Sequence, residues 1–129
     1  MVIQFWQDPA KKIIDPEIFS IKAEKLSKTL AGVRQRNKRT QIRRFYDEVL
    51  RFDQDAKTLG PEKWPDILAR LHLLIPKAAY ALGRELVSQE FVDFIKGSVT
   101  QVKTKEDLTV FANLFEAFMG FYKLDRPKD

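Results

Sequence analysis

The sequence predicts an all-α fold, in which a compact single-domain bundle of about five helices spans residues 15–124, after an extended N-terminal arm (1–14) and before a polar tail (125–129). Three observations predict it. Apolar residues recur at the i, i+3, i+4 spacing of an amphipathic helix along most of the chain. The turn signals are those of helix ends, and no alternating apolar and polar run indicates a competing strand. A chain of 129 residues is also long enough to bury a single core.

The predicted arm shows no sustained helical or strand period, and it combines large apolar side chains with Pro9. This pattern is typical of an extended segment. Phe5 and Trp6 gain free energy by leaving water, so they are expected to pack either against the domain's own core or against a neighbouring subunit. The sequence alone leaves both alternatives open.

A first helix is predicted from residue 16 to 31. Asp15 suits the N-cap, where a carboxylate accepts hydrogen bonds from first-turn amides, and Pro16 suits the first helical position. Gly32 is expected to be the C-cap. The apolar face of this helix comprises Phe19, Ala23, Leu26, Leu30 and Val33.

A polar connector, 34–39, leads to a second helix that Thr40 is expected to cap and that ends before Gly60. Arg44 and Arg51 lie within about 20° of each other on the outer face, because they are seven residues apart at 100° per residue. Two arginines are thus predicted to point the same way from one rigid rod. The core-facing stripe of this helix comprises Ile42, Phe45, Tyr46, Val49 and Leu50.

A wide apolar stripe predicts a third helix over residues 64–75. Pro76 is expected to break or kink it, because proline lacks an amide hydrogen and disfavours the helical region for the residue before it. The helix is expected to resume over residues 77–84. The single histidine, His72, lies between two leucines and is expected in the core or at its edge.

Ser88 is expected to cap a fourth helix, and Thr104 a final one, where Asp107 completes a near capping box. The apolar arc of the final helix spans about half of the helical wheel. An arc this wide is typical of the central rod of a bundle; otherwise part of it would form a subunit interface. The arc comprises Leu108, Val110, Phe111, Leu114, Phe115, Ala117, Phe118, Met119, Phe121 and Tyr122.

The residue types that most catalytic and metal sites need are missing from the chain. Without cysteine there is no disulfide, thiol nucleophile or cysteine-ligated zinc, and one histidine excludes sites built on imidazole pairs. No glycine-rich phosphate loop or HExxH motif occurs. We therefore expect no enzymatic activity, no catalytic residue, no metal and no cofactor. No apolar run approaches the roughly 18 residues of a membrane span, and no secretory signal opens the chain, which predicts a cytoplasmic protein without membrane contact.

Positive charge is concentrated in one quarter of the sequence. Residues 22–51 hold ten lysines and arginines against three acids, a net charge of +7, whereas the remainder holds thirteen against fifteen, a net charge of −2. Asymmetry of this kind is typical of a surface that binds a polyanion, although a basic segment is also compatible with an ordinary solvated face.

The cations of the connector have no acid close to them in sequence, whereas those of the second helix do. Arg43 and Asp47 are spaced for an i,i+4 ion pair, and so are Arg44 and Glu48, and such pairs would be ordinary surface contacts. A set of cations without an exposed stacking aromatic suits backbone binding, whereas a single-strand reader would carry aromatics between its cations. The candidate binding residues are Lys38, Arg39, Arg43, Arg44, Arg51, Lys77 and Arg84.

Two motifs resemble those of a known family. Lys38-Arg-Thr-Gln-Ile-Arg-Arg-Phe-Tyr46, followed by Tyr80-Ala-Leu-Gly-Arg84 and an aromatic final helix, is similar to the small helical subunit of type III-A CRISPR-Cas (Csm) effector complexes. The likeness covers roughly residues 20–124, and its most specific part is Thr40 to Tyr46. The N-terminal arm lies outside it.

The resemblance implies a non-catalytic subunit that self-associates into a filament beside the filament that holds the guide RNA. Its implied partners are the other Csm subunits and the backbones of the guide RNA and target RNA. The family's basic surface corresponds here to Lys38, Arg39, Arg43 and Arg44, with Arg84 from the second motif. Guide pairing would supply sequence recognition, so this chain would need only to position phosphates.

Two other functions are compatible with the residues. A helical protein-interaction module would use the same basic segment to dock an acidic protein partner. A helix-turn-helix DNA regulator would use the second helix, which follows a short basic turn, as a recognition helix.

Overall fold

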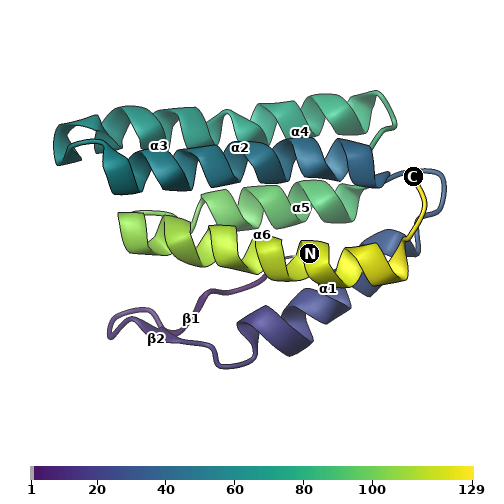
Figure 1. Ribbon diagram of the computed structural model, residues 1–129, viewed down its shortest axis with the longest axis horizontal. Helices are drawn as coiled ribbons and strands as arrows, with labels where there is room; N and C mark the ends of the chain where they lie inside the picture. Colours follow the sequence, from purple (N-terminus) through teal and green to yellow (C-terminus); the bar gives the residue numbers. More distant parts are fainter. Residues whose placement is uncertain (1) are drawn as a thin grey trace.

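A computed structural model describes residues 2–129; Met1 of the predicted arm lies outside the described residues. It confirms the all-α bundle, to which the described residues add one two-stranded hairpin (Figure 1). The strands are β1 (Trp6–Asp8) and β2 (Ile13–Ile14), and the π-helical turn η1 (Ile18–Lys22) and the 3₁₀ turn η2 (Pro61–Lys63) precede helices. The helices are α1 (Ala23–Ala31), α2 (Arg39–Thr58), α3 (Trp64–His72), α4 (Leu74–Gly83), α5 (Gln89–Val99) and α6 (Lys105–Asp125).

The helices form layers around α6, as its wide apolar arc predicted. In Figure 1, α2 runs beside the α3–α4 rod, α5 and α6 lie in the middle, and α1 and the hairpin cover the other side. Phe94 of α5 lies among the rings of α6, 5.4 Å from Phe115 and 6.1 Å from Phe118 between centroids. The arc is therefore buried within one chain. Its buried members are Leu108, Val110, Phe111, Leu114, Phe115, Phe118 and Tyr122.

The cap of α6 matches its prediction, and that of α5 does so in part. The Thr104 hydroxyl accepts a hydrogen bond from the Asp107 amide at 3.3 Å, and the Asp107 carboxylate accepts one from the Thr104 amide at 3.0 Å, which completes the capping box. Ser88 occupies the N-cap of α5, but its hydroxyl accepts from Asn37 instead of from the helix.

The first helix begins later than predicted, and its caps differ. Asp15 accepts a hydrogen bond from the Glu17 amide at 2.9 Å, as a cap would, but a π-helical turn intervenes before α1. Gly32 is the C-cap in a right-handed conformation (φ −67°). The second helix starts at Arg39 with Lys38 as N-cap, so Thr40 lies in the first turn instead.

The third helix breaks earlier than proline chemistry predicted. The interruption is at Leu73, and Pro76 lies in the first turn of α4. Amides of a first helical turn have no partner within the helix, so a proline there removes no hydrogen bond. The α3–α4 rod is therefore one bent unit, in agreement with a bundle of about five rods.

Three residues assigned to the core lie at the surface. His72 is exposed, because Leu71 and Leu74 face the core and position 72 points away from it. Phe19 and Leu50 are 37% and 38% exposed. On the apolar stripe of α2, Val49 lies at the centre and Leu50 at the edge.

The arm is a hairpin of two short extended strands that packs against the bundle, in agreement with the predicted extended segment. Trp6 pairs with Ile14 across the strands. Phe5 is fully buried, with its ring 6.2 Å from that of Phe111, and its amide donates to the Gln101 side chain at 2.9 Å. The domain's own core thus receives the Phe5 ring, and the alternative of a neighbouring subunit is not needed.

Candidate nucleic-acid interface

Asn37 shapes the connector that carries the basic residues. It is fully buried and holds a left-handed conformation (φ 63°), which asparagine adopts more readily than most residues. Its side-chain amide donates to the Leu30 carbonyl at 3.2 Å and to the Ser88 hydroxyl at 2.8 Å, and its oxygen accepts from the Ser88 amide at 2.8 Å. The connector is thereby tied both to the end of α1 and to the segment between α4 and α5.

Tyr122 of α6 supports the same bend from inside the bundle. Its fully buried hydroxyl donates a 2.6 Å hydrogen bond to the Asn37 carbonyl oxygen. Burial raises the pKa of Tyr122, so the hydroxyl remains a donor at neutral pH. The position of the residue that follows, Lys38, is therefore fixed by contacts in the core.

Arg126 holds the other half of the connector. Its guanidinium donates to the main-chain carbonyls of Val33 at 3.2 Å and Arg34 at 2.7 Å, and also to that of Arg36. It is 8% exposed and pairs with Asp129 at 3.1 Å. Carbonyls just beyond a helix C-terminus carry partial negative charge, so a cation there is stabilising. The polar tail thus contains a structural clamp.

Lys38 and Arg39 are adjacent in sequence but differ in their contacts. Lys38 is exposed, and in the described part of the chain its side chain makes no hydrogen bond or ion pair. Arg39 is half-buried, and it donates from its guanidinium to the Pro127 carbonyl at 2.7 Å and from its amide to the Asp129 main-chain oxygen at 2.6 Å. Lys38 is available to a ligand as it stands, whereas Arg39 is engaged with the tail.

The expected pairing of Arg44 with Glu48 is replaced by other contacts. The Glu48 carboxylate accepts from Lys77 of α4 at 2.8 Å and lies 3.5 Å from Arg51. Arg44 is exposed and has no ion pair within residues 2–129. The predicted pair of Arg43 with Asp47 forms at 3.8 Å between two highly exposed side chains, so it is a weak contact.

The contact between Lys77 and Glu48 also sets how α4 lies against α2. The two helices are antiparallel, so residues later in α4 than Lys77 lie beside residues earlier in α2 than Glu48 (Figure 1). Arg84, which follows α4, and Arg44 are therefore at the same end of the molecule. The Arg84 guanidinium lies 5.8 Å from the centre of the Tyr80 ring.

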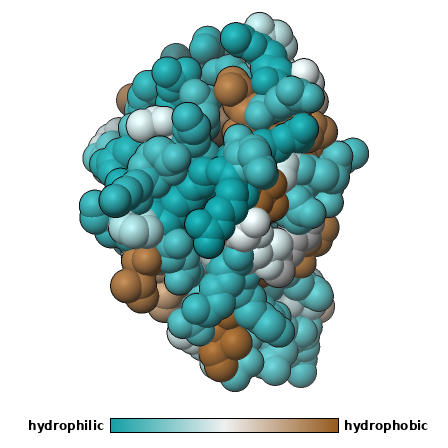
Figure 2. Space-filling model, turned by 90° about the vertical axis from the view of Figure 1, so that its right-hand side faces the viewer, coloured by the Kyte–Doolittle hydropathy of each residue, from teal (hydrophilic) through white to brown (hydrophobic). Residues whose placement is uncertain are grey.

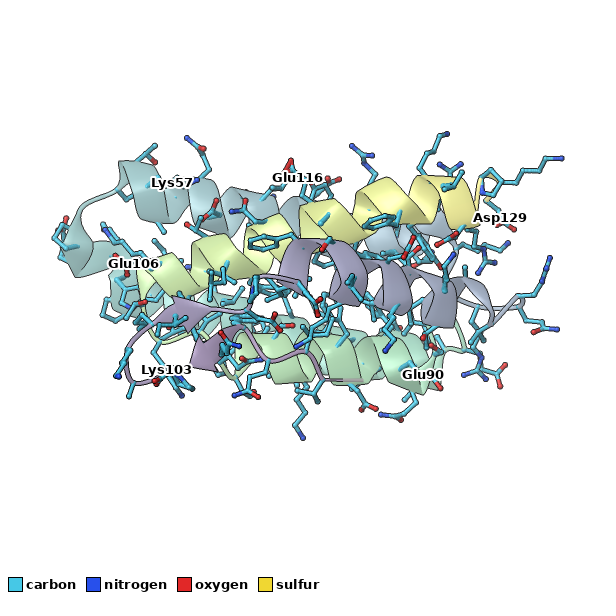
Figure 3. All side chains as sticks on the ribbon, turned by 90° about the horizontal axis from the view of Figure 1, so that it is seen from below. Lys57, Glu90, Lys103, Glu106, Glu116 and Asp129 are labelled. Atoms are coloured by element: carbon cyan, nitrogen blue, oxygen red, sulfur yellow. The ribbon has the colours of Figure 1, made fainter. Side chains whose placement is uncertain are left out.

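We call Lys38, Arg43, Arg44 and Arg84 the basic edge. Its two halves, on α2 and after α4, are joined through Asn37 and Ser88. Figure 2 looks onto this end of the bundle, and hydrophilic residues cover most of the face shown. Asp129 lies at this end, opposite Lys57 and Glu106 (Figure 3). Three of the seven candidate residues lie outside the basic edge: Arg39 is engaged with the tail, and Arg51 and Lys77 share Glu48. Arg43 is kept because its contact with Asp47 is weak.

The basic edge offers positive charge and hydrogen-bond donors. In the described residues, no three histidine, cysteine or acidic side chains are placed to hold a metal ion. No helix of residues 2–129 has both the length and the hydropathy to cross a bilayer. Fixed cations at one edge are suited to binding the phosphates of a nucleic acid backbone.

Sequence reasoning missed the residues that support the edge. Asn37 carried a weak signal, because asparagine at the end of a connector is typical of a left-handed bend. Arg126 carried none, because its acceptors are main-chain carbonyls about ninety residues away. Tyr122 was assigned to the core for its ring alone, and its hydroxyl contact was not predicted.

Comparison with known proteins gives one match. A family model described as Csm2 Type III-A matches residues 15–128, nearly the whole chain. The comparisons with curated proteins and with solved structures found no match. The matched region contains α1 to α6 and every residue of the basic edge.

Proposed function

Because the chain belongs to the Csm2 type III-A family, and is therefore a small subunit of the type III-A Csm complex, we propose that it binds the RNA backbone of the guide–target duplex without reading its sequence. The observation that carries this proposal is the pair of exposed cations Lys38 and Arg44, which no acid in residues 2–129 neutralises although acids are close by. Cations held in this way gain binding energy by displacing counterions from phosphates.

The support beneath these cations also favours a binding surface. Asn37 and Tyr122 fix Lys38 from the core, and Ile42 and Phe45, both buried, fix α2 so that Arg44 faces outward. A long side chain on a rigid base loses less conformational freedom on binding than one on a mobile loop. Base pairing with the guide reads the sequence in guide-directed complexes, so a rigid, sequence-indifferent cationic edge is sufficient for this subunit.

Self-association into a filament within the complex is part of the same proposal. The arm aromatics and the α6 arc, which suggest such an interface in the sequence, are largely inside the domain. Self-association is supported by the family and by the apolar residues that remain exposed. Two of these, Leu59 and Leu73, border a groove of about 400 Å³ between α2 and α3. Light scattering with and without RNA tests it: a monomeric mass under both conditions, at high protein concentration, would contradict it.

Binding to two RNA duplexes of unrelated sequence, titrated across a range of salt concentrations, tests the main proposal. We expect equal affinities for the two sequences and a linear fall of log K with log salt. A tenfold preference for one sequence, or affinity that does not depend on salt, would contradict it. Capture of an acidic protein from nuclease-treated lysate, without RNA binding, would instead support a protein-interaction module.

A further inference from the structure

Tyr80 is an exposed aromatic residue at the end of the molecule that carries the basic edge. It is 67% exposed, whereas the rings of Phe91, Phe94 and Phe111 are fully buried in the core. The Arg84 guanidinium lies 5.8 Å from its ring centre. We propose that the Tyr80 ring is a stacking platform for an unpaired RNA base, with Arg84 and Arg44 binding the phosphates on either side of that base. This inference rests on the proposed RNA binding and adds a second kind of contact to it.

The Tyr80 ring lies largely in water. An aromatic ring in water forfeits the free energy that burial would provide, and the small-residue surface of α4 (Ala78, Ala81) is packed inward without it. Within the described residues, the Tyr80 ring is not part of the hydrophobic core. A base, which is a flat π-system, covers such a ring at little cost in side-chain entropy, because tyrosine has only two rotatable side-chain torsions.

Two cations accompany the Tyr80 ring: Arg84 lies over it, and Arg44 lies at the same end of the molecule. The contact between Lys77 and Glu48 fixes the antiparallel register of α4 and α2, so Tyr80 lies one helical turn further toward the end of α2 that bears Arg44. Arg44 has no ion pair in residues 2–129, and Arg84 has only its contact with the ring. Aromatic rings between unneutralised cations are the arrangement by which proteins bind single-stranded nucleic acid.

The Tyr80 ring would not recognise a continuous duplex. The bases of a continuous duplex are stacked on one another and offer no face to an external ring. Lys38 and Arg43 can bind the backbone of a paired strand, whereas the Tyr80 ring can stack only on a base that lies outside the duplex stack. The sequence predicted a set of cations without an exposed aromatic residue. The structure instead places the exposed ring of Tyr80 at the same end of the molecule as these cations. The surface therefore has two separable parts, one for phosphates and one for an unpaired base.

The full chain with three RNA probes tests this inference. The probes are a single-stranded oligoadenosine of about 12 nucleotides, an RNA duplex of the same length, and an abasic strand that keeps the backbone. We compare Tyr80→Ala and Tyr80→Phe, with Ile21→Ala as the control, because Ile21 is also an exposed apolar residue (49%) but lies in η1, before α1. A thermal melt of each variant checks that the fold is retained.

We expect Tyr80→Ala to weaken binding of the single strand about five-fold or more, and to leave duplex and abasic affinity within about two-fold. Tyr80→Phe should bind like the unaltered chain, since the ring is kept, and so should Ile21→Ala. If Tyr80→Ala binds all three probes as the unaltered chain does, stacking is refuted while RNA binding stands. If the unaltered chain binds none of the probes, the proposed function itself fails.

Discussion

The Arg126 guanidinium donates a 2.7 Å hydrogen bond to the main-chain carbonyl of Arg34, 92 residues earlier in the chain. This contact holds the connector by its backbone and leaves the Arg34 side chain exposed. The connector is thus held in place without using the Arg34 side chain. A buried arginine that organises exposed lysines and arginines explains how a segment of high positive charge keeps one conformation.

Replacing Arg126 with alanine should destabilise the domain by about 3 kcal/mol, because three main-chain carbonyls at the connector would no longer have a charged donor. Urea unfolding followed by circular dichroism measures the change. Lys128→Ala is the matched control, since Lys128 is an exposed cation of the same tail. A loss of stability for Arg126→Ala no larger than that of the control would show that the clamp does not support the connector.

Replacing Glu48 with glutamine should strengthen RNA binding, because this carboxylate neutralises both Lys77 and Arg51. We expect the slope of log K against log salt to steepen by about one, as for one additional phosphate contact. The free energy of unfolding should change by less than about 1 kcal/mol, since the lysine and arginine are more than half exposed. Glu62→Gln, at the opposite end of the molecule, makes the same change in net charge and should leave the slope unaltered.

Stability should fall in acid through Asp107. Burial is the strongest single influence and raises its pKa, but hydrogen bonds from Lys12 and from the Lys103 and Thr104 amides together outweigh it, so the pKa is lowered from 3.8. A carboxyl whose folded pKa lies below its unfolded value binds fewer protons when folded. Its contribution is therefore complete above about pH 4 and is lost as the pH falls through the folded pKa.

Urea unfolding of the unaltered chain and of Asp107→Asn at pH 6 and pH 3 measures this contribution. We expect the unaltered chain to be more stable than the variant at pH 6 and the gap to narrow at pH 3. An equal gap at both pH values would mean that ionisation of Asp107 contributes nothing. Trp6 and Lys12 of the arm donate to the same carboxylate, at 3.0 and 2.7 Å, so the arm should loosen in the same pH range.

Replacing Phe5 with alanine should cost about 3 kcal/mol of stability, because removal of its fully buried ring would leave a cavity beside Phe111. Val2→Ala is the control within the same arm, since Val2 is 68% exposed and should change stability by less than about 0.5 kcal/mol. Chemical denaturation of the three proteins makes the comparison. Equal stability of the two variants would show that the arm is not part of the core.

Helical periodicity predicted the bundle, its central α6 and the Thr104 cap, because these depend on residues close in sequence. It did not show where the arm packs, because Phe5 is buried beside Phe111 and held by Gln101, about a hundred residues away. Local sequence patterns carry no information about a packing partner so distant in the chain. The break at Leu73 was misplaced for a different reason: a proline in a first turn is neutral, and the sequence does not show where the turn begins.

The candidate site was predicted only in part for the same physical reason. Arg43 and Arg44 were placed outward correctly, because the α2 stripe fixes the helix orientation. The predicted pair of Arg43 with Asp47 forms, but that of Arg44 with Glu48 does not, since Glu48 contacts Lys77 of α4 and Arg51 instead. Arg39 has no acid near it in sequence, yet carbonyls of the distant tail accept its hydrogen bonds.

The salt dependence of RNA binding by the double variant Arg43→Ala, Arg44→Ala tests the central claim most directly. Removal of each phosphate-binding cation should reduce the slope of log K against log salt by about one, so we expect a reduction approaching two and weaker binding of every sequence. Lys63→Ala with Arg70→Ala, which removes two cations from the opposite end, should leave the slope unchanged. Unaltered affinity and slope in the Arg43, Arg44 variant would contradict the account.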